Sequence, residues 1–209
     1  MVDGRHGNMK KIVVFIQTRV GSTRLPGKVL KKVNGRELLL YQVDRIRTAK
    51  TVNDIVVITT TKKEDDQIEL LCSKNKIHCY RGNEYDLLDR HYQAAKYFNA
   101  DFVVKIPSDS PLVDSNIIDK VINLWLKNPS KYDYVSNYHP PTFPDGLDVE
   151  GCSIEILEDA WVHADKDYER EHTFPYIWDN PDKFKIGNIV NKYGNMFTTH
   201  RWTLDYDED

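Results

Sequence analysis

Several features that would assign a protein to a class at once are scarce or absent in this sequence of 209 residues. There are only three cysteines, Cys72, Cys79 and Cys152, and none has the spacing of a Cys-x-x-Cys or zinc-finger motif. We expect reduced, mostly buried thiols. No apolar run approaches the roughly 20 residues that span a bilayer, and no signal-peptide pattern is present. These absences predict a cytoplasmic protein with no membrane partner.

An excess of charge of one sign is also lacking. The 29 Lys and Arg residues stand against 32 Asp and Glu, for a net charge of -3. Such a balance gives no overall positive field to attract a polyanion, so we expect no nucleic-acid partner.

Length and composition predict one globular domain. The hydrophobic fraction of 40% and the aromatic fraction of 11% are typical of folded proteins, and the length suits a single core. Residues 1–8 are polar and glycine-rich and precede Met9 and an apolar strand pattern. We interpret them as an N-terminal extension or a remnant of cloning, and 9–209 as the domain.

Short apolar runs alternate with helical patterns along the chain. The runs at 12–16, 55–58 and 102–106 are rich in β-branched residues and too short for helices, as is typical of buried parallel strands. Amphipathic patterns lie between them and after Ser115. This order predicts an α/β fold with a mostly parallel open sheet flanked by helices, a Rossmann-like three-layer sandwich. Ligands of such sheets bind beyond the carboxyl ends of the strands.

The strongest functional signal is the loop at 17–28, directly after the first predicted strand. Arg19, Arg24 and Lys28 can donate charge-assisted hydrogen bonds to a triphosphate. Gly21 and Gly27 lack a Cβ and allow the backbone to approach phosphate closely. A merely solvated loop is the alternative, but the position after a buried strand favours a binding role.

Two common nucleotide motifs are excluded for this loop. Five residues rather than four separate Gly21 from Gly27, and Val29 stands where a P-loop has its magnesium-binding Ser or Thr. The pattern is also not Gly-x-Gly-x-x-Gly, which argues against a dinucleotide-binding oxidoreductase.

A candidate metal ligand follows the third strong strand pattern. Asp109 lies in a turn between Pro107 and Pro111, just past the run at 102–106. Magnesium is usually held by one or two carboxylates together with substrate phosphates, so Asp109 could anchor it.

The loop and five further segments resemble the cytidylyltransferases that include CMP-KDO synthetase and acylneuraminate cytidylyltransferase. From Met9 onward the pattern is most similar to the branch of spore coat polysaccharide biosynthesis protein F (SpsF). The segments that carry the resemblance are QTRVGSTRLPGKVL at 17–30, TTT at 59–61, YRG at 80–82, PDGLDVE at 144–150, EREH at 169–172 and HRWTLD at 200–205.

The resemblance implies the fold of nucleotide-diphospho-sugar transferases. It also implies transfer of CMP from CTP to a sugar acid or similar acceptor, with release of pyrophosphate, in the synthesis of surface polysaccharide precursors. Arg19, Arg24, Lys28 and Asp109 would be catalytic. The implied nucleotide-binding residues are Gln17, Thr18, Arg19, Gly21, Ser22, Thr23, Arg24, Lys28, Thr60, Thr61, Arg81 and Gly82. An ordinary capping turn explains Thr60 and Thr61 equally well.

The implied metal is Mg²⁺, with Mn²⁺ as an alternative, and its implied ligands are Asp109 and Asp205. Relatives carry a Gly-Asp pair where this sequence has Ser108 before Asp109. They also continue into a further helix beyond 205–209, so we expect a domain shortened at its C-terminus. Whether Asp205 is ordered is left open.

The acceptor side is expected in the part after Tyr132, where long βα units give way to short mixed segments. Asp145, Asp148 and Glu150 could accept hydrogen bonds from sugar hydroxyls, although an Asp-Gly turn before a strand explains the same residues. By resemblance, Arg170 and His172 lie near the acceptor pocket.

Two other functions stay open at this stage. A noncatalytic nucleotide-binding module would keep the loop without the chemistry. A metal-dependent glycosyltransferase on a related sheet would favour an Asp-x-Asp motif, which Asp109 does not form. The identity of the acceptor and the existence of a homodimer are also open.

Overall fold

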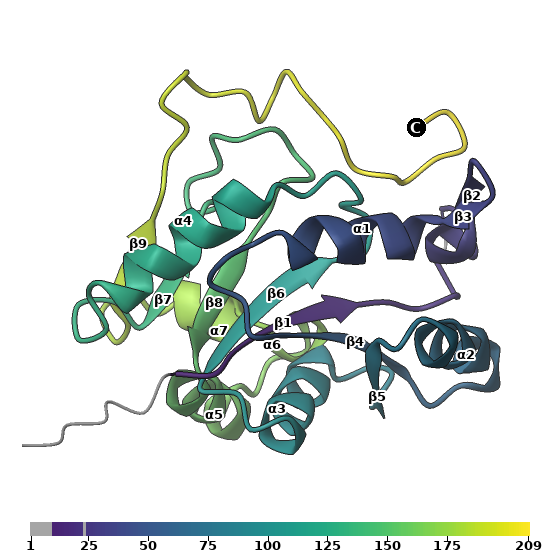
Figure 1. Ribbon diagram of the computed structural model, residues 1–209. Coiled ribbons are helices and arrows are strands. Elements are labelled where there is room, and N and C mark those ends of the chain that lie inside the picture. Colours follow the sequence, from purple (N-terminus) through teal and green to yellow (C-terminus); the bar gives the residue numbers. More distant parts are fainter. Residues whose placement is uncertain (1–9, 23) are drawn as a thin grey trace, which may run out of the picture.

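The computed structural model describes residues 10–22 and 24–209. Apart from a short hairpin after the first strand, its elements alternate between strands and helices up to residue 126 (Figure 1). In chain order they are β1 (Ile12–Gln17), η1 (Lys28–Leu30), β2 (Lys32–Val33), β3 (Arg36–Glu37), α1 (Leu38–Arg47), β4 (Asp54–Thr60), η2 (Lys63–Asp65), α2 (Asp66–Lys74), β5 (His78–Gly82), α3 (Leu87–Tyr97), β6 (Phe102–Pro107), α4 (Ser115–Leu126), β7 (Tyr134–Ser136), β8 (Glu150–Ser153), α5 (Ile154–His163), α6 (Asp167–Glu171), α7 (Pro175–Trp178) and β9 (Ile186–Asn188).

Seven strands form the main sheet in the order β5-β4-β1-β6-β8-β7-β9. The strands β5, β4, β1 and β6 are parallel, and β8 is antiparallel to both of its neighbours. The registers Gln17↔Ile58 and Gln17↔Pro107 place the carboxyl ends of β4, β1 and β6 at one edge. The predicted mostly parallel α/β sheet is therefore confirmed, and the loops that follow these strands meet at that edge.

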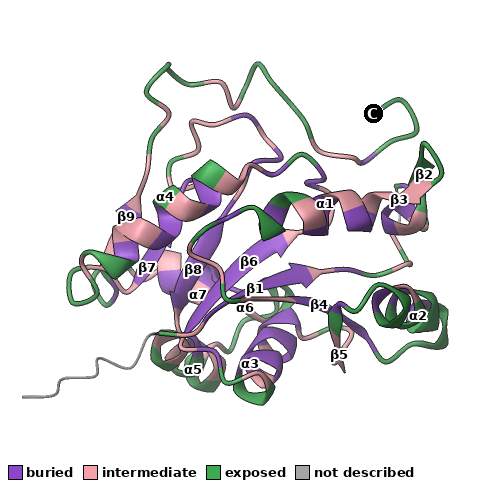
Figure 2. Ribbon diagram, viewed as in Figure 1, coloured by how far each residue is buried: buried purple, intermediate pink, exposed green. Residues whose placement is uncertain are grey.

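Both faces of the sheet are buried, which explains the nearly continuous hydrophobicity of its central strands. On β1, Ile12, Val14 and Ile16 pack with α1, α2 and α4 on one face. Val13 and Phe15 pack with α3 and α5 on the other. Figure 2 shows the buried strands between the two helical layers.

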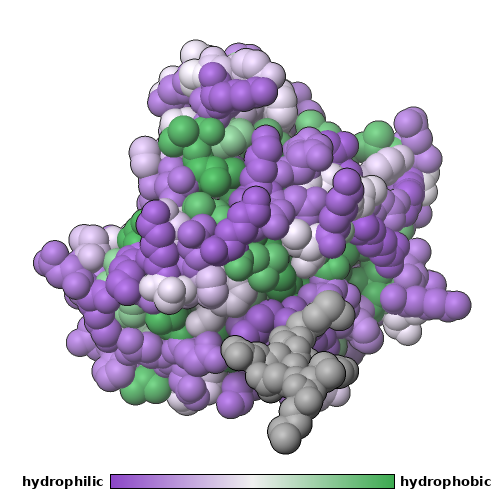
Figure 3. Space-filling model, turned by 60° about the vertical axis from the view of Figure 1, so that its left-hand side comes forward, coloured by the Kyte–Doolittle hydropathy of each residue, from purple (hydrophilic) through white to green (hydrophobic). Residues whose placement is uncertain are grey.

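The surface is mixed. On the side shown in Figure 3, hydrophilic side chains predominate and hydrophobic ones lie between them. Within residues 10–22 and 24–209, no helix has the length and apolar character that crossing a membrane requires.

The structure adds a hairpin that the pattern analysis did not predict. Strands β2 and β3 pair in antiparallel fashion across Asn34 and Gly35, which have φ values of 51° and 78°. An Asn-Gly pair suits this turn because both positions need positive φ. Two-residue strands are too short to produce a visible alternation.

The last segment of the chain, residues 189–209, crosses the sheet edge. Figure 1 shows it in yellow, passing from β9 above α4 and α1 toward the β2–β3 hairpin. The backbone N–H of Leu204 donates to the carbonyl oxygen of Asp109 over 2.8 Å, and Arg201 forms a parallel bridge with Asp145. The chain end therefore lies beside the turn that follows β6.

Candidate active site

A cavity of about 480 Å³ opens at the carboxyl ends of β1 and β6. Eight of its lining residues were singled out from the sequence: Gln17, Thr18, Arg19, Ser22, Arg24, Lys28, Asp109 and His172. The others are Glu84, Tyr85, Leu87, Arg90, Ser108 and Glu171. The candidate loop thus faces the turn that carries Asp109, as the topology of the sheet requires.

Lys28 is the centre of this site. Gly27 has a φ of 67°, and its N–H donates to the Val20 carbonyl oxygen over 2.9 Å, which turns the loop back into η1. A residue with a Cβ would be strained in this left-handed conformation. The turn directs Lys28 inward, where it is only 8% exposed.

The Lys28 ammonium group joins two carboxylates from distant parts of the chain. Its Nζ donates to Asp205 Oδ1 over 3.0 Å and to the Leu204 carbonyl oxygen over 2.9 Å, and it lies 3.5 Å from Asp109 Oδ2. Arg24 Nη2 adds a second donation to Asp205 Oδ1 over 2.8 Å. Asp205, whose order the sequence left open, is buried here and held by two cations.

Close backbone packing brings the Asp205 segment into place. Gly146 has a φ of 98°, and a Cβ on it would lie 2.7 Å from the Trp202 carbonyl carbon. The N–H of Trp202 donates to the Asp145 carbonyl oxygen over 2.7 Å. Glycine at position 146 therefore lets the two segments run side by side.

Two further carboxylates lie near this pair. Burial, followed by the charge of Asp109, raises the pKa of Asp145. Burial and then Asp145 and Glu150 raise the pKa of Asp148 to about 7. Crowded carboxylates favour protonated forms because like charges repel, and a cation that enters would relieve that repulsion.

The donor set fits a magnesium ion in part. Among the described residues no group of three or more His, Cys, Asp or Glu side chains is placed to hold a metal ion. Asp109 and Asp205 nevertheless converge on one ammonium group, and oxygen ligands from one or two carboxylates plus substrate phosphates are the usual protein site for Mg²⁺.

The residues after β4 anchor the loop rather than line the cavity. The carboxylate of buried Asp65 accepts from the Val20 N–H over 2.8 Å, and also from the hydroxyl and N–H of Thr60. Thr61 is exposed. Thr60 is thus engaged with Asp65, but it caps neither η2 nor α2, whose N-cap residues are Lys62 and Asp65. Thr23 lies outside the described residues.

Arg81 points away from the cavity toward α2. Its guanidinium donates to Asp66 over 2.6 Å and to Glu69 over 2.9 Å, and its Nε donates to the Thr60 carbonyl oxygen over 2.9 Å. Gly82 borders the cavity indirectly, because a Cβ there would lie 3.0 Å from Cγ of Arg90. Arg90, which the sequence reading did not single out, is the arginine from this region that lines the cavity.

The residues predicted for the acceptor have different surroundings. Glu150 is buried, and its carboxylate accepts from Lys105 over 2.9 Å and from Tyr134 over 2.6 Å. Burial alone would raise the pKa of Glu150. The charge of Lys105 and the hydrogen bonds that Glu150 accepts outweigh burial and lower the pKa to about 2. Glu150 is therefore an interior ion-pair partner.

Arg170 and His172, which are neighbours in the sequence, separate in space. Arg170 Nε donates to Asp86 over 2.8 Å and its Nη1 to the Trp161 carbonyl oxygen over 2.7 Å, so it ties α6 to the start of α3. His172 is exposed and lines the cavity. Only His172 is positioned to meet a ligand there.

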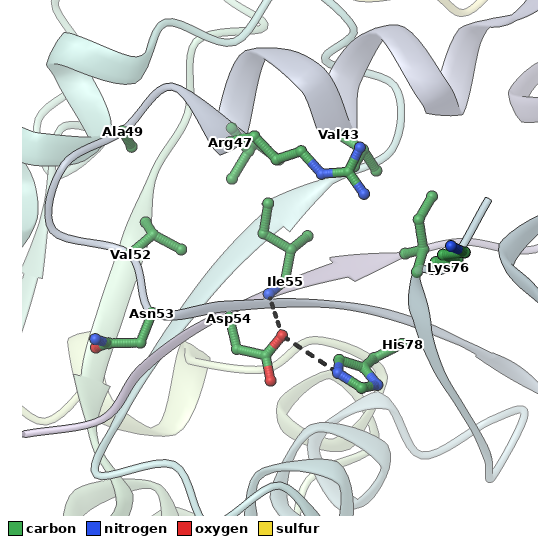
Figure 4. A pocket seen from close by; sticks show the side chains of 11 residues that line it. Val43, Arg47, Ala49, Val52, Asn53, Asp54, Ile55, Lys76 and His78 are labelled. Carbon is green, nitrogen blue, oxygen red and sulfur yellow. Dashed lines mark hydrogen bonds and ion pairs between the residues drawn. The ribbon is translucent and has the colours of Figure 1, made fainter.

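A smaller cavity of about 310 Å³ lies at the opposite edge of the sheet, where β4 and β5 begin (Figure 4). Its polar groups are largely paired with one another: Asp54 Oδ1 accepts from the Ile55 N–H over 2.8 Å and lies 3.8 Å from His78 Nε2. Arg47 pairs with Asp44. Ligands of open α/β sheets bind at the carboxyl edge, which favours the first cavity.

Comparisons with known proteins identify relatives of the whole chain. A family model described as cytidylyltransferase matches residues 13–203. An uncharacterized protein of Methanocaldococcus jannaschii is 42% identical over 84% of this chain and 70% of its own length. The spore coat polysaccharide biosynthesis protein SpsF of Bacillus subtilis is 30% identical over 96% of this chain and 84% of its own length. The structure of a cytidylyltransferase from Leptospira borgpetersenii superposes with a TM-score of 0.91 at 35% identity, covering 96% of this chain and 83% of that one.

Proposed function

The chain belongs to the cytidylyltransferase family, and from that premise we propose that it is a magnesium-dependent enzyme that transfers CMP from CTP to a sugar-acid-like acceptor and releases pyrophosphate. The resemblance drawn from the sequence is confirmed by this membership. The similarity to SpsF supports a role in the synthesis of polysaccharide precursors.

The observation that carries the proposal is the convergence of Lys28, Asp109 and Asp205 beside a glycine-containing loop. Lys28 and Arg24 supply positive charge to the phosphates. When nucleotide binds, phosphate oxygens compete with the carboxylates for these cations. Asp109 and Asp205 are then free to ligate a metal ion.

Catalysis in this scheme depends on position and electrostatics. The acceptor oxygen attacks the α-phosphorus in line, and pyrophosphate departs with the bonding electrons, so no covalent enzyme intermediate forms. Bound Mg²⁺ would offset the negative charge of the phosphates. In this scheme Arg24 and Lys28 exchange their contacts to Asp205 for contacts to the phosphates and stabilise charge on the leaving group.

Two carboxylates whose pKa values are raised by burial and by the charge of Asp109 suit the acceptor. Asp145 and Asp148 face the same acidic region and accept hydrogen bonds from hydroxyl groups. Asp148, with a pKa raised to about 7, is also able to take a proton from an attacking hydroxyl near neutral pH. Glu150 supports them from the interior through Lys105 and Tyr134.

A pyrophosphate-release screen tests the function. Each nucleoside triphosphate is incubated with a panel of sugar acids and phosphorylated polyols, with and without Mg²⁺. We expect release only with CTP, Mg²⁺ and one class of acceptor. Asp109→Asn should lower turnover by roughly a hundredfold or more with the fold intact. Asp182→Asn, at an exposed position, is the matched control. Normal turnover of Asp109→Asn would contradict the assignment.

A further inference from the structure

Arg90 is a buried cation in the cavity wall that lacks an acidic partner. It belongs to α3 and is only 5% exposed. Its Nη1 donates to the Asn83 carbonyl oxygen over 2.9 Å, while its Nε–H is buried and has no hydrogen-bond partner among the described residues. Among the described residues no carboxylate lies within 4.0 Å of the Arg90 guanidinium group, whereas Arg24 and Lys28 have such partners. Arg19 also lacks one, but it is exposed to solvent.

This arrangement is costly without a ligand. A buried charge that lacks an ion pair destabilises the folded state, and an unsatisfied buried donor adds to that cost. Burial, and then the charge of Arg19, lower the pKa of Arg90 to about 10. A residue that only packed in the wall would serve better without the charge. The guanidinium group is therefore placed for hydrogen bonds to something that enters the cavity.

The local structure makes room for this side chain. A Cβ on Gly82 would lie 3.0 Å from Cγ of Arg90 and 3.2 Å from a ring carbon of Tyr80. Those contacts are too close for most residues, so glycine at position 82 lets Arg90 pass between β5 and α3. The buried aliphatic part of Arg90 is thereby fixed against the sheet.

Arg90 comes from the segment after β5, at one end of the strand order, whereas Asp109 follows β6, on the other side of β1. The charges that act most on the pKa of Arg90 belong to Arg19, Asp65, Glu84 and Asp86. Tyr85 and Leu87, from the same segment of the chain, also line the cavity. Lys28, Asp109 and Asp205 define the polyphosphate end. The Arg90 end, with planar and apolar neighbours, fits the nucleobase.

We propose that Arg90 selects the nucleobase by donating hydrogen bonds from its guanidinium group to O2 and N3 of cytosine. This inference rests on the proposed function and names the residue that sets its preference for CTP. Cytosine presents two adjacent acceptors to a fork of donors. Uracil carries a hydrogen on N3, so it would oppose a donor with a donor and leave Arg90 unsatisfied in a buried site.

Buried, charge-assisted base contacts of this kind discriminate between bases by roughly ten- to a hundredfold. The wild-type protein should therefore bind CTP more tightly than UTP by about that factor. The triphosphate of 3-deazacytidine, in which C–H replaces N3, keeps the phosphates, the sugar, O2 and the amino group. It should lose a similar factor because one acceptor is missing.

The experiment measures the dissociation constants of three nucleotides by isothermal titration calorimetry, with Mg²⁺ present and without an acceptor. CTP, UTP and 3-deazacytidine triphosphate are titrated into wild type, Arg90→Gln and Arg90→Lys, with Arg47→Gln, at an exposed surface position, as control. In both Arg90 variants we expect the CTP affinity to fall to near that of UTP, so that the three ligands bind within about threefold. The control should keep the wild-type ratios.

Two results would overturn the inference. An equal loss of CTP and UTP affinity in the Arg90 variants would place the guanidinium on the phosphates or the sugar. Wild-type protein that binds 3-deazacytidine triphosphate as tightly as CTP would exclude the N3 contact, even if no Arg90 variant folds. Failure of wild type to bind CTP at all would instead refute the proposed function, and this inference with it.

Discussion

Replacing Lys28 by methionine removes the cation that holds Asp109 and Asp205 together. The side chain of Lys28 is 9% exposed and contacts Asp205 Oδ1 at 3.0 Å and Asp109 Oδ2 at 3.5 Å. Removing one partner of a buried ion pair costs about 3–5 kcal/mol. Asp109 is 29% exposed and keeps some hydration, so we place the loss in unfolding free energy at about 2–3 kcal/mol.

Magnesium should restore much of this loss in Lys28→Met. Asp109 then lacks its cationic partner and Asp205 keeps the partly exposed Arg24. A divalent cation that binds only the folded protein stabilises it by mass action. At ten times its dissociation constant this contributes about 1.4 kcal/mol. Wild-type protein should gain less from the same Mg²⁺ concentration, because Lys28 already neutralises the pair.

Urea denaturation at several MgCl₂ concentrations, followed by circular dichroism, measures both effects. Lys31→Met is the matched control, since Lys31 is an exposed lysine that pairs with Asp207 at the surface, and its loss should cost under about 1 kcal/mol without changing the response to Mg²⁺. Two results would refute the proposed arrangement of Lys28, Asp109 and Asp205. One is that Lys28→Met unfolds at the same urea concentration as wild type, and the other is that Mg²⁺ stabilises Lys28→Met and wild type equally.

Three further predictions concern the surroundings of the site. Gly146→Ala should lower turnover and destabilise the fold by about 1–3 kcal/mol, because it combines a positive φ with a Cβ placed 2.7 Å from the Trp202 carbonyl carbon; thermal unfolding and turnover measure the two effects. The pKa of Asp148 is raised to about 7, so the folded protein favours the protonated carboxyl group. Ionising Asp148 therefore destabilises the folded state: this cost is absent well below pH 4 and grows until about pH 7. Asp148→Asn without Mg²⁺ should accordingly be more stable than wild type by roughly 2–4 kcal/mol at pH 8 and by much less at pH 5; an equal gain at both pH values would contradict the shift. Glu150→Leu should cost about 3–5 kcal/mol, whereas the double variant with Lys105→Met should recover most of it in denaturation experiments, and additive losses would refute the buried pair.

The parts of the fold that local patterns specify were predictable. The central strands read as apolar runs because both sheet faces are covered. The candidate loop stood out because its cations and glycines follow such a strand directly, and the structure places it in the cavity wall. The Asn34-Gly35 pair was also a usable signal, since this dipeptide favours the observed hairpin, but the flanking strands are only two residues each.

The direction of individual side chains was not predictable from the sequence. Arg81 and Arg90 lie close together in the chain. Arg81, which precedes Gly82 directly, was the one predicted to contact the ligand. Arg81 instead forms ion pairs with Asp66 and Glu69 on α2 and does not line the cavity. These pairs depend on the packing of α2 against β5, which the sequence does not show. Arg90 instead enters the cavity wall beside Gly82.

Long-range charge pairing was equally hidden. Glu150 belongs to a segment that resembles the family, and it was therefore predicted to meet the acceptor. Its partner Lys105 is 45 positions away, inside a strand that reads as apolar. Which carboxylate reaches the site and which is neutralised in the interior depends on the antiparallel pairing of β6 with β8, which no local pattern specifies.

The bridge from Lys28 to Asp205 also orders events during biosynthesis. These residues are separated by 177 positions, and Arg24 and Asp205 by 181. On the ribosome every strand of the sheet is made before position 205 has emerged. A nascent chain can therefore contain every strand of the main sheet while the proposed polyphosphate site still lacks the carboxylate of Asp205. On the proposed mechanism, activity requires synthesis past that point.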